Sequence, residues 1–194
     1  MSEPEISTPS EFSLCGQLLI AMPNMLDPSF AGSVVYLCEH NAKGAMGLVI
    51  NRATDLDIPA LLEKIDLQVS PDLPDHFPVM MGGPVASERG FVLHTKPLTW
   101  NSSLVVNDDI SLTTSRDILE AVASGNPPGD WLITLGYAGW GEGQLEEELA
   151  QNAWLTVPAN HDILFNMPLE ERFASAYGLL GIDPTLMTGA AGHA

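Results

Sequence analysis

Two apolar stretches separated by a short polar segment constrain the fold of this chain more than any other feature of its sequence. Ser33-Val-Val-Tyr-Leu-Cys-Glu39 and Ala45-Met-Gly-Leu-Val-Ile50 flank five turn-forming residues, His40-Asn-Ala-Lys-Gly44. Runs rich in β-branched and apolar residues on either side of a turn predict a β-hairpin. Both arms are nearly continuous in hydrophobicity, which is typical of strands covered on both faces. The chain is therefore predicted to build a sheet with packing on both sides.

The rest of the chain interleaves helices and strands without regular alternation. Helices are predicted over Ile58–Lys64, Thr114–Gly125, Glu142–Gln151 and Pro168–Gly181, and strands over Val79–Met81, Gly90–His94, Leu104–Val106, Trp131–Leu135 and Trp154–Val157. Thr114 is expected to cap its helix because Asp117 follows three residues later. Three prolines predict a long loop over 65–78. This order favours an α+β fold with a mixed sheet surrounded by helices.

A single domain over residues 13–187 is expected, between an acidic tail (1–12) and a tail of small residues (188–194). The 194 residues fall within the size of one domain. The first twelve residues contain no Lys or Arg, unlike a secretory signal, and apolar runs such as Leu18–Met22 are far shorter than the ~20 residues of a membrane span. We therefore expect a cytoplasmic protein in which Cys15 and Cys38 are reduced.

The charge balance disfavours two classes of partner. The net charge is −18, because 25 acidic residues face only 7 Lys and Arg. Nucleic-acid affinity depends on cations that displace counterions from phosphates, so direct DNA or RNA binding is disfavoured. Docking on anionic lipid is disfavoured for the same reason. The composition suits solubility or a basic partner.

Long ordered strings resemble the bacterial YqgE/AlgH family. They are Ala21-Met-Pro-Asn-Met-Leu-Asp-Pro28, Ser33-Val-Val-Tyr-Leu-Cys-Glu-His-Asn41, Gly47-Leu-Val-Ile-Asn-Arg52, Gly82-Gly-Pro-Val85, Arg89-Gly-Phe-Val-Leu-His94, Thr113-Thr-Ser-Arg-Asp-Ile-Leu119, Leu135-Gly-Tyr-Ala-Gly-Trp-Gly141, Gly143-Gln-Leu-Glu146 and Asn152-Ala-Trp-Leu-Thr-Val-Pro158. The resemblance covers roughly residues 13–183 and implies a strongly bent or barrel-like sheet surrounded by helices, in a cytosolic protein. Some members of the family are named transcriptional regulators, and the family brings no established catalytic residues.

The most reactive grouping in the sequence is Cys38-Glu39-His40. Residues two apart on a strand share a face, so Cys38 and His40 are expected to point together. A neighbouring imidazolium lowers the pKa of a thiol, which is how cysteine nucleophiles and redox sensors arise. The alternative is a buried, inert cysteine beside a turn histidine. A structural zinc site needs four ligands and no second pair follows, so neither a metal nor a cofactor is expected.

Arginines are scarce enough in this chain to be informative. Asn51-Arg52 ends a strand, Arg89 precedes another, and Arg116 lies in the first turn of a helix. One interpretation gathers the three arginines in a pocket for an anionic ligand or a partner's carboxylates. The other pairs them with the abundant Asp and Glu residues in internal salt bridges.

Two glycine-rich segments could present side chains to a ligand. Gly136-Tyr-Ala-Gly-Trp-Gly-Glu-Gly143 is expected to form a turn between a strand and a helix, and four nearby glutamates argue against phosphate binding there. Trp140 in this segment is either an exposed contact or part of the core. Gly82-Gly-Pro84 is predicted to end a strand, or to allow close approach of a ligand. His94 and His161 are predicted to be structural.

These observations leave three functional hypotheses. The leading one is a non-enzymatic regulatory or adaptor protein that binds a protein or small ligand through Asn51, Arg52, Arg89, Arg116 and Trp140. The alternative is an enzyme or redox sensor centred on Cys38, with His40 as the base. The third is direct control of transcription through DNA, which rests on the name of the family alone and which the net charge opposes.

Overall fold

The computed structural model describes residues 13–25, 27–95 and 100–181. The strands are β1 (Gln17–Ala21), β2 (Val34–Asn41), β3 (Gly44–Val49), β4 (Met80–Met81), β5 (Val85–Thr95), β6 (Ser103–Val105), β7 (Ile110–Thr113), β8 (Trp131–Trp140) and β9 (Trp154–Pro158). The helices are α1 (Ile58–Lys64), α2 (Arg116–Ala123), α3 (Gln144–Ala150), the π-helix η1 (Asp162–Asn166) and α4 (Leu169–Gly178). None of the helices within the described ranges combines the length and apolar character needed to cross a bilayer.

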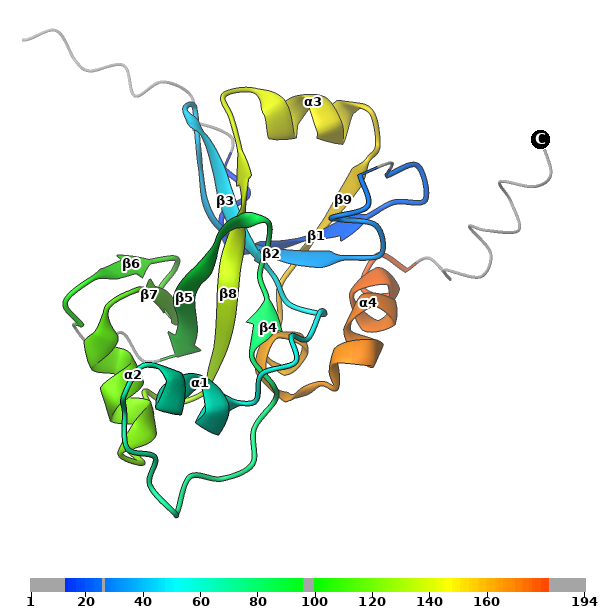
Figure 1. Ribbon diagram of the computed structural model, residues 1–194. Coiled ribbons are helices and arrows are strands. Elements are labelled where there is room, and N and C mark those ends of the chain that lie inside the picture. The colour runs from blue at the N-terminus through cyan, green and yellow to red at the C-terminus, as the bar shows by residue number, and fades with distance from the viewer. Residues whose placement is uncertain (1–12, 26, 96–99, 182–194) are drawn as a thin grey trace, which may run out of the picture.

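The strands form one curled sheet, a half barrel in the order β6-β7-β5-β8-β3-β2-β1-β9 (Figure 1). The pairs along this order are antiparallel, and β4 adds a parallel pair with β8. The long strand β8 joins the two halves, because its first part pairs with β5 and its last part with β3. Gly136 lies between these parts with φ +77°, a conformation that glycine adopts without strain. The sheet therefore bends where β8 passes from one set of neighbours to the other.

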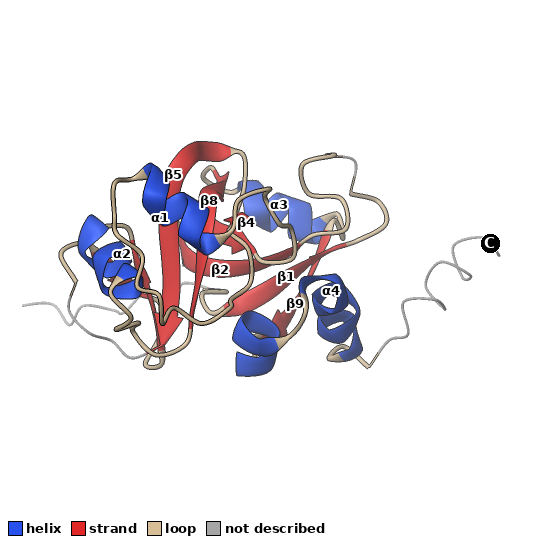
Figure 2. Cartoon of the chain, turned by 60° about the horizontal axis from the view of Figure 1, so that its bottom comes forward, coloured by secondary structure: helices blue, strands red, loops and turns tan. Residues whose placement is uncertain are grey.

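Side chains on both faces of the sheet are buried, as the continuous hydrophobicity of the hairpin predicted. In β2, Tyr36 faces a cluster that η1 and α4 complete, while its neighbour Leu37 faces a second cluster beneath α3. A third cluster lies between α1, α2 and the other half of the sheet, where Ile133 of β8 packs. Figure 2 shows helices on both sides of the strands. The domain is thus a layered α+β structure with core on each face of one sheet.

Most of the predicted elements are present. The hairpin is confirmed with a shorter turn, since only Ala42 and Lys43 separate β2 from β3. The helix α1 has the predicted bounds, and β4, β5, β6 and β9 lie where strands were expected. The long loop between α1 and β4 is also confirmed. The predicted tails, 1–12 and 188–194, lie outside the described residues.

Three predictions about local structure were wrong. The segment from Gly136 onward is not a turn, because β8 continues through Trp140. A Cβ at Gly136 would lie 2.4 Å from the carbonyl oxygen of Gly83, so the glycine permits close packing of two backbones. The residue at the N-cap of α2 is Ser115 rather than Thr114, and its hydroxyl donates to Asp117. The last helix, α4, ends at Gly178, earlier than expected.

The sequence did not predict β1, β7 or η1. Strand β1 is a short unbroken apolar run, which carries no period that separates a strand from a helix. Strand β7 has only four residues, and η1 is a π-helix, for which no sequence pattern is established. In the structure, β1 pairs with β2, β7 pairs with β5, and η1 packs into the cluster that Tyr36 faces.

Candidate functional site

The predicted pair Cys38 and His40 is separated by an irregularity in β2. Leu37 pairs with Gly47 of β3 and Glu39 pairs with Met46, so two residues on β2 advance the register by one on β3. Cys38 is the extra residue of this β-bulge. The bulge interrupts the alternation of faces, and His40 pairs with Ala45 on the face that α3 covers. Cys38 instead faces the cluster beneath α4 and η1. The prediction that the two side chains point together was therefore wrong.

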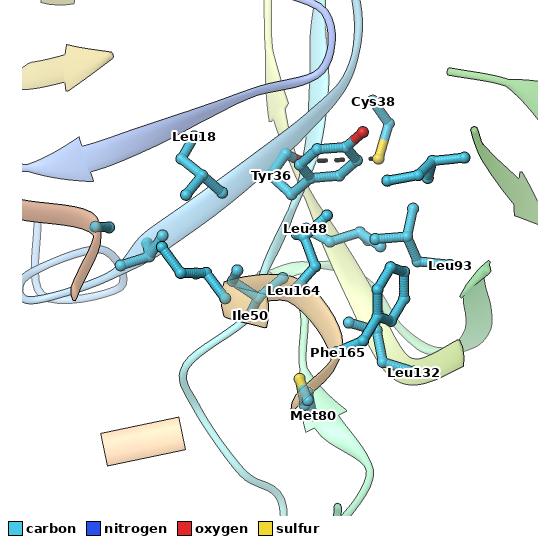
Figure 3. Close-up of a cluster of buried hydrophobic side chains, with 14 of the residues drawn as sticks. Leu18, Tyr36, Cys38, Leu48, Ile50, Met80, Leu93, Leu132, Leu164 and Phe165 are labelled. Atoms are coloured by element: carbon cyan, nitrogen blue, oxygen red, sulfur yellow. Dashed lines mark hydrogen bonds between the residues drawn. The ribbon is translucent and has the colours of Figure 1, made fainter. Parts of the chain in front are cut away.

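The environment of Cys38 opposes thiolate chemistry. The residue is 1% exposed, and its thiol lies beside Tyr36, whose carbonyl oxygen is 3.7 Å from the sulfur (Figure 3). Burial raises the pKa of the Cys38 thiol far above its ordinary value, and the neighbouring Cys15 and Glu39 raise it further. A thiol in this setting stays protonated and shielded from oxidants, which is the inert alternative.

His40 has a structural role in place of the predicted one. The backbone N–H of Leu14 donates to its Nδ1 over 3.0 Å, and its Nε2 lies 2.5 Å from Oε1 of Glu146 on α3. Since Nδ1 accepts, Nε2 carries the proton that is donated to the carboxylate. His40 thus fastens α3 and the segment before β1 to the end of the hairpin.

Trp140 belongs to the core. It is 5% exposed, its ring stacks on Phe30 at 6.0 Å, and it meets Trp154 edge to face at 5.9 Å. Its Nε1 donates to Glu148 of α3. Of the two alternatives for Trp140, the structure therefore supports packing rather than an exposed contact.

The three arginines do not meet in one pocket. Arg116 is half exposed and pairs with Glu120 one turn further along α2, at 3.4 Å. Arg89 is exposed on β5, where its guanidinium lies 6.0 Å from the ring centre of Phe91. Within the described residues, neither Arg89 nor Arg52 forms a salt bridge with a carboxylate. Of the three arginines, only Arg116 forms the internal salt bridge that the second interpretation predicted.

Asn51 and Arg52 organise the backbone near the end of β3. Asn51 accepts a hydrogen bond from the Val34 N–H and donates to the carbonyl of Gly32, which fixes the start of β2. Arg52 donates from its two terminal nitrogens to the carbonyl oxygens of Ser29 and Ala31. These bonds hold the guanidinium at one side of a pocket of about 490 Å³, which we name the Arg52 pocket.

The Arg52 pocket lies where β4 enters the sheet between two strands that diverge. Its lining residues are Ser29, Val49, Arg52, Thr54, Met81, Gly83, Pro84, Ser87 and Leu135. Gly82 receives a hydrogen bond from the Val49 N–H and donates one to the carbonyl of Leu135. A Cβ on Gly83 would lie 2.2 Å from the backbone of Tyr137, so only glycine permits this crossing. The backbone of Gly83 thereby forms part of the wall.

The lining of the Arg52 pocket combines one cation with apolar and hydroxyl groups. Met81 is 50% exposed, and Val49, Pro84 and Leu135 supply further apolar lining. Arg52 is the one charged residue among those that line it, and two of its five N–H groups are engaged. The remaining N–H groups of Arg52 can donate to an oxygen atom of a ligand, while the apolar side chains of the pocket contact its hydrocarbon part.

Sequence reasoning identified only part of this pocket. Arg52 was predicted as a binding residue, and Gly82-Gly-Pro84 as the end of a strand or, alternatively, a point of close ligand approach. Ser29, Thr54, Met81 and Ser87 carried no signal of their own. Arg116 and Trp140 lie elsewhere, and Arg89 is not among the lining residues. Within the described ranges, no cluster of three or more His, Cys, Asp or Glu side chains is placed to hold a metal ion.

His94 and His161 make the structural contacts that were expected of them. His94 is buried, with Nδ1 3.1 Å from the carbonyl oxygen of Thr95 and Nε2 2.8 Å from the hydroxyl of Thr113. His161 pairs with Asp130 through Nε2 at 2.6 Å, and both side chains are about half exposed. His94 therefore links strands of the sheet, while His161 and Asp130 lie at its surface.

Comparison with known proteins identifies relatives over nearly the whole chain. The model of a family described as AlgH-like matches residues 18–185. A UPF0301 protein of Burkholderia vietnamiensis is 54% identical over 192 residues, which cover 97% of this chain and 100% of the relative. A UPF0301 protein of Cupriavidus metallidurans is 58% identical over 182 residues, covering 94% of this chain and 96% of the relative.

Solved structures share the fold. The AlgH protein of Pseudomonas aeruginosa is similar with a TM-score of 0.78 and 47% identity, and the match covers 100% of both chains. A protein of Corynebacterium diphtheriae matches with a TM-score of 0.62 over 79% of each chain; at 19% identity, this likeness shows the fold alone. The predicted fold class, a bent α+β sheet surrounded by helices, is confirmed.

Proposed function

The chain belongs to the AlgH-like family, and from that premise we propose that it is a non-enzymatic regulatory or adaptor protein of the cytosol. In this proposal, the Arg52 pocket captures a partner protein or a small ligand. The observation that carries the proposal is the convergence of three distant strings that mark the family. Gly47–Arg52, Gly82–Val85 and Leu135–Gly141 each contribute lining residues to this one pocket.

The chemistry of the pocket favours a ligand with an apolar group and an oxygen acceptor. Met81, Pro84 and Leu135 would cover the apolar group, in the way that buried anchors fill pockets at interfaces. Arg52 would bind the acceptor, and most strongly a carboxylate, with the donors that it does not use internally. Its position is already fixed by Ser29 and Ala31, so binding costs little side-chain entropy.

Other features of the molecule support binding over catalysis and over DNA recognition. The thiol of Cys38 is buried and lies on a different face from His40, so the proposal assigns no nucleophile. The net charge of −18 supports a protein or small-molecule partner rather than a phosphate backbone. A regulatory role would then be exerted through the captured partner.

The test compares two arginine variants with the same change in charge. Purified wild-type protein, Arg52→Ala and Arg116→Ala are immobilised, and saturable capture from a bacterial lysate is quantified by mass spectrometry. We expect Arg52→Ala to lose the captured partner and Arg116→Ala to retain it, because Arg116 pairs with Glu120 on α2 and does not line the pocket. Equal capture by both variants would show that Arg52 does not form the binding surface.

A further inference from the structure

One wall of the Arg52 pocket comes from an irregular part of β5. This strand pairs with β8 at Val85 and again at Gly90, and between these points β5 advances five positions while β8 advances only two. The intervening residues, 86–89, form an exposed bulge in which Ala86 has φ +47°. A residue other than glycine is strained in this left-handed conformation, and such strain concentrates where ligands are held. Ser87 of this bulge lines the pocket.

The pocket offers one positive charge and no negative one. Arg52 is the one charged residue in its lining, and none of the described residues that line it is Asp, Glu or His. Leu26, the one residue between positions 13 and 95 that lies outside the described ranges, has an apolar side chain. The lining therefore suits a monoanion and gives an ammonium group no partner, which disfavours a free amino acid. The net charge of −18 also opposes ligands with two negative charges.

The apolar part of the lining lies directly beside the cation. The N–H of Met81 donates to the carbonyl oxygen of Arg52 over 2.8 Å, so the two residues are neighbours, and Leu135 of β8 lines the same pocket. A ligand must therefore carry its negative charge and its apolar group close together. The last residue of a protein chain meets this condition, because its carboxylate and its side chain leave the same Cα atom. An internal Asp or Glu has its apolar neighbours on other residues.

We propose that the Arg52 pocket binds the C-terminal residue of a partner protein, with an apolar side chain at that position. The terminal carboxylate accepts from the N–H groups of Arg52 that its bonds to the backbone leave unused. The last side chain packs on Met81 and Leu135, and the preceding peptide group passes the exposed Ser29 and Ser87. Capture of a terminal carboxylate is a known mode of peptide recognition. This inference rests on the proposed function, since it names the ligand class of the same pocket.

Four probes separate the terminal carboxylate from charge and apolar area alone. They are acetyl-alanyl-alanyl-leucine with a free carboxylate, its C-terminal amide, acetyl-alanyl-leucyl-glutamate α-amide, and hexanoate. We expect the free acid to bind at least about tenfold more tightly than the other three, because only it combines the charge-assisted bonds with the peptide and side-chain contacts. NMR shifts are expected at Arg52, Met81 and Leu135. Equal binding of any other probe, or shifts confined to other regions, would overturn the proposal.

Matched variants test the two halves of the recognition. Met81→Ser and Leu179→Ser alter side chains that are 50% and 48% exposed, so both proteins should fold, and only Met81 lines the pocket. Met81→Ser should reduce the advantage of the leucine peptide over one that ends in glycine by roughly threefold to tenfold, whereas Leu179→Ser should leave it unchanged. Arg52→Gln keeps a donor but removes the charge, and should weaken the free acid at least about tenfold. Equal effects of the two serine variants would contradict the proposal.

The results distinguish this inference from the proposed function. If the peptide amide binds as well as the acid while capture from the lysate still requires Arg52, the pocket is a binding site but does not recognise a chain terminus. The inference then fails and the proposed function stands. If neither peptide binding nor capture depends on Arg52, both fail together.

Discussion

Arg172 is a buried cation whose partners are backbone carbonyl groups rather than carboxylates. Its Nε donates to Met167 and one terminal nitrogen donates to Ile50, at 2.9 and 3.0 Å, while its guanidinium lies 5.0 Å from the ring centre of Phe77. The other terminal nitrogen has no acceptor among the described residues. Desolvation lowers the pKa of Arg172 to about 10, so the charge persists at neutral pH. Arg172 therefore connects the end of β3, next to Arg52, to the segment before α4.

Truncation of Arg172 should be strongly destabilising. Arg172→Ala leaves the carbonyls of Ile50 and Met167 without donors and opens a cavity, so we expect the free energy of unfolding to fall by roughly 2–5 kcal/mol. Arg172→Met keeps most of the volume and removes a buried charge, so its loss should be smaller. Urea denaturation of the three proteins measures both effects. A loss for Arg172→Met as large as that for Arg172→Ala would mean that volume is irrelevant at this position.

The two thiols should both react slowly at neutral pH, but for different reasons. Cys38 is buried, so its alkylation should require unfolding. Cys15 is partly exposed, and burial followed by the charge of Glu39 raises its pKa, so it should react only at alkaline pH. Alkylation from pH 6 to 9, followed by mass spectrometry, resolves the two. Rapid reaction of Cys38 near pH 6 would restore the cysteine-based hypothesis.

At the scale of elements, the acidic side chains of α3 attach this helix to the sheet by hydrogen bonds. This helix has only seven residues, and its side chains attach it to the sheet. Glu146 accepts from His40, and Oε1 of Glu148 accepts from the indole nitrogens of both Trp140 and Trp154. In the sequence these glutamates had only indicated that phosphate is repelled. Their partners lie on β2, β8 and β9, and no local pattern predicts such distant contacts.

The contribution of the Glu146–His40 contact to stability should decrease as the pH becomes acidic. The hydrogen bond from His40 lowers the pKa of Glu146 below its ordinary value of 4.5. A carboxyl with a lowered folded-state pKa contributes stability above its unfolded pKa and loses it as the pH falls through the folded value. Glu146→Gln should therefore be less stable than the wild type at pH 7, and the difference should shrink below about pH 4.5. Thermal unfolding across pH 3–7 measures it, and a difference that is constant with pH would contradict the assignment.

Gly83 should tolerate no side chain, because its backbone packs directly against the backbone of β8. Gly83→Ala places a Cβ 2.2 Å from the Tyr137 backbone, whereas a Cβ at Gly90 of β5 meets no atom within 4 Å. We expect Gly83→Ala to destabilise the protein by several kcal/mol, on the order of other overpacked sites, and Gly90→Ala to have little effect. Urea midpoints of the two variants test this contrast. Similar midpoints would mean that the crossing relaxes easily.

The limits of prediction from this sequence lie in long-range contacts. The hairpin and α1 follow from local patterns, and both are found with nearly their predicted bounds. The bulge at Cys38 could not be predicted, because the apolar run of β2 is nearly continuous and has no period of two in which a shift of register would be visible. Likewise, the segment that begins at Gly136 has the composition of a turn, but it continues strand β8. The missing side chain of Gly136 lets the backbone of Gly83 pack closely against that strand. Arg52 was predicted as a site residue, whereas its apolar neighbours depend on tertiary structure.

At the scale of the whole molecule, the Arg52 pocket places a cation on the surface of a strongly acidic chain. Its arginine is one of only 7 Lys and Arg residues in the sequence, against 25 Asp and Glu. The strong net charge attracts basic partners at long range. To bind an acidic group of a partner, such a chain needs a cation held at the point of contact, and Arg52 is in that position. The proposed function therefore requires that partners contact the Arg52 pocket.

The most direct measurement is photo-crosslinking in bacterial cells with p-benzoylphenylalanine in place of Met81 or Leu179. Both residues are large, apolar and about half exposed, at 50% and 48%, but only Met81 lines the Arg52 pocket. We predict a discrete crosslinked product from position 81 that decreases when Arg52→Ala is present in the same chain, and no such product from position 179. Crosslinking that is equal at the two positions, or that does not respond to Arg52→Ala, would contradict the assignment of this pocket as the binding site.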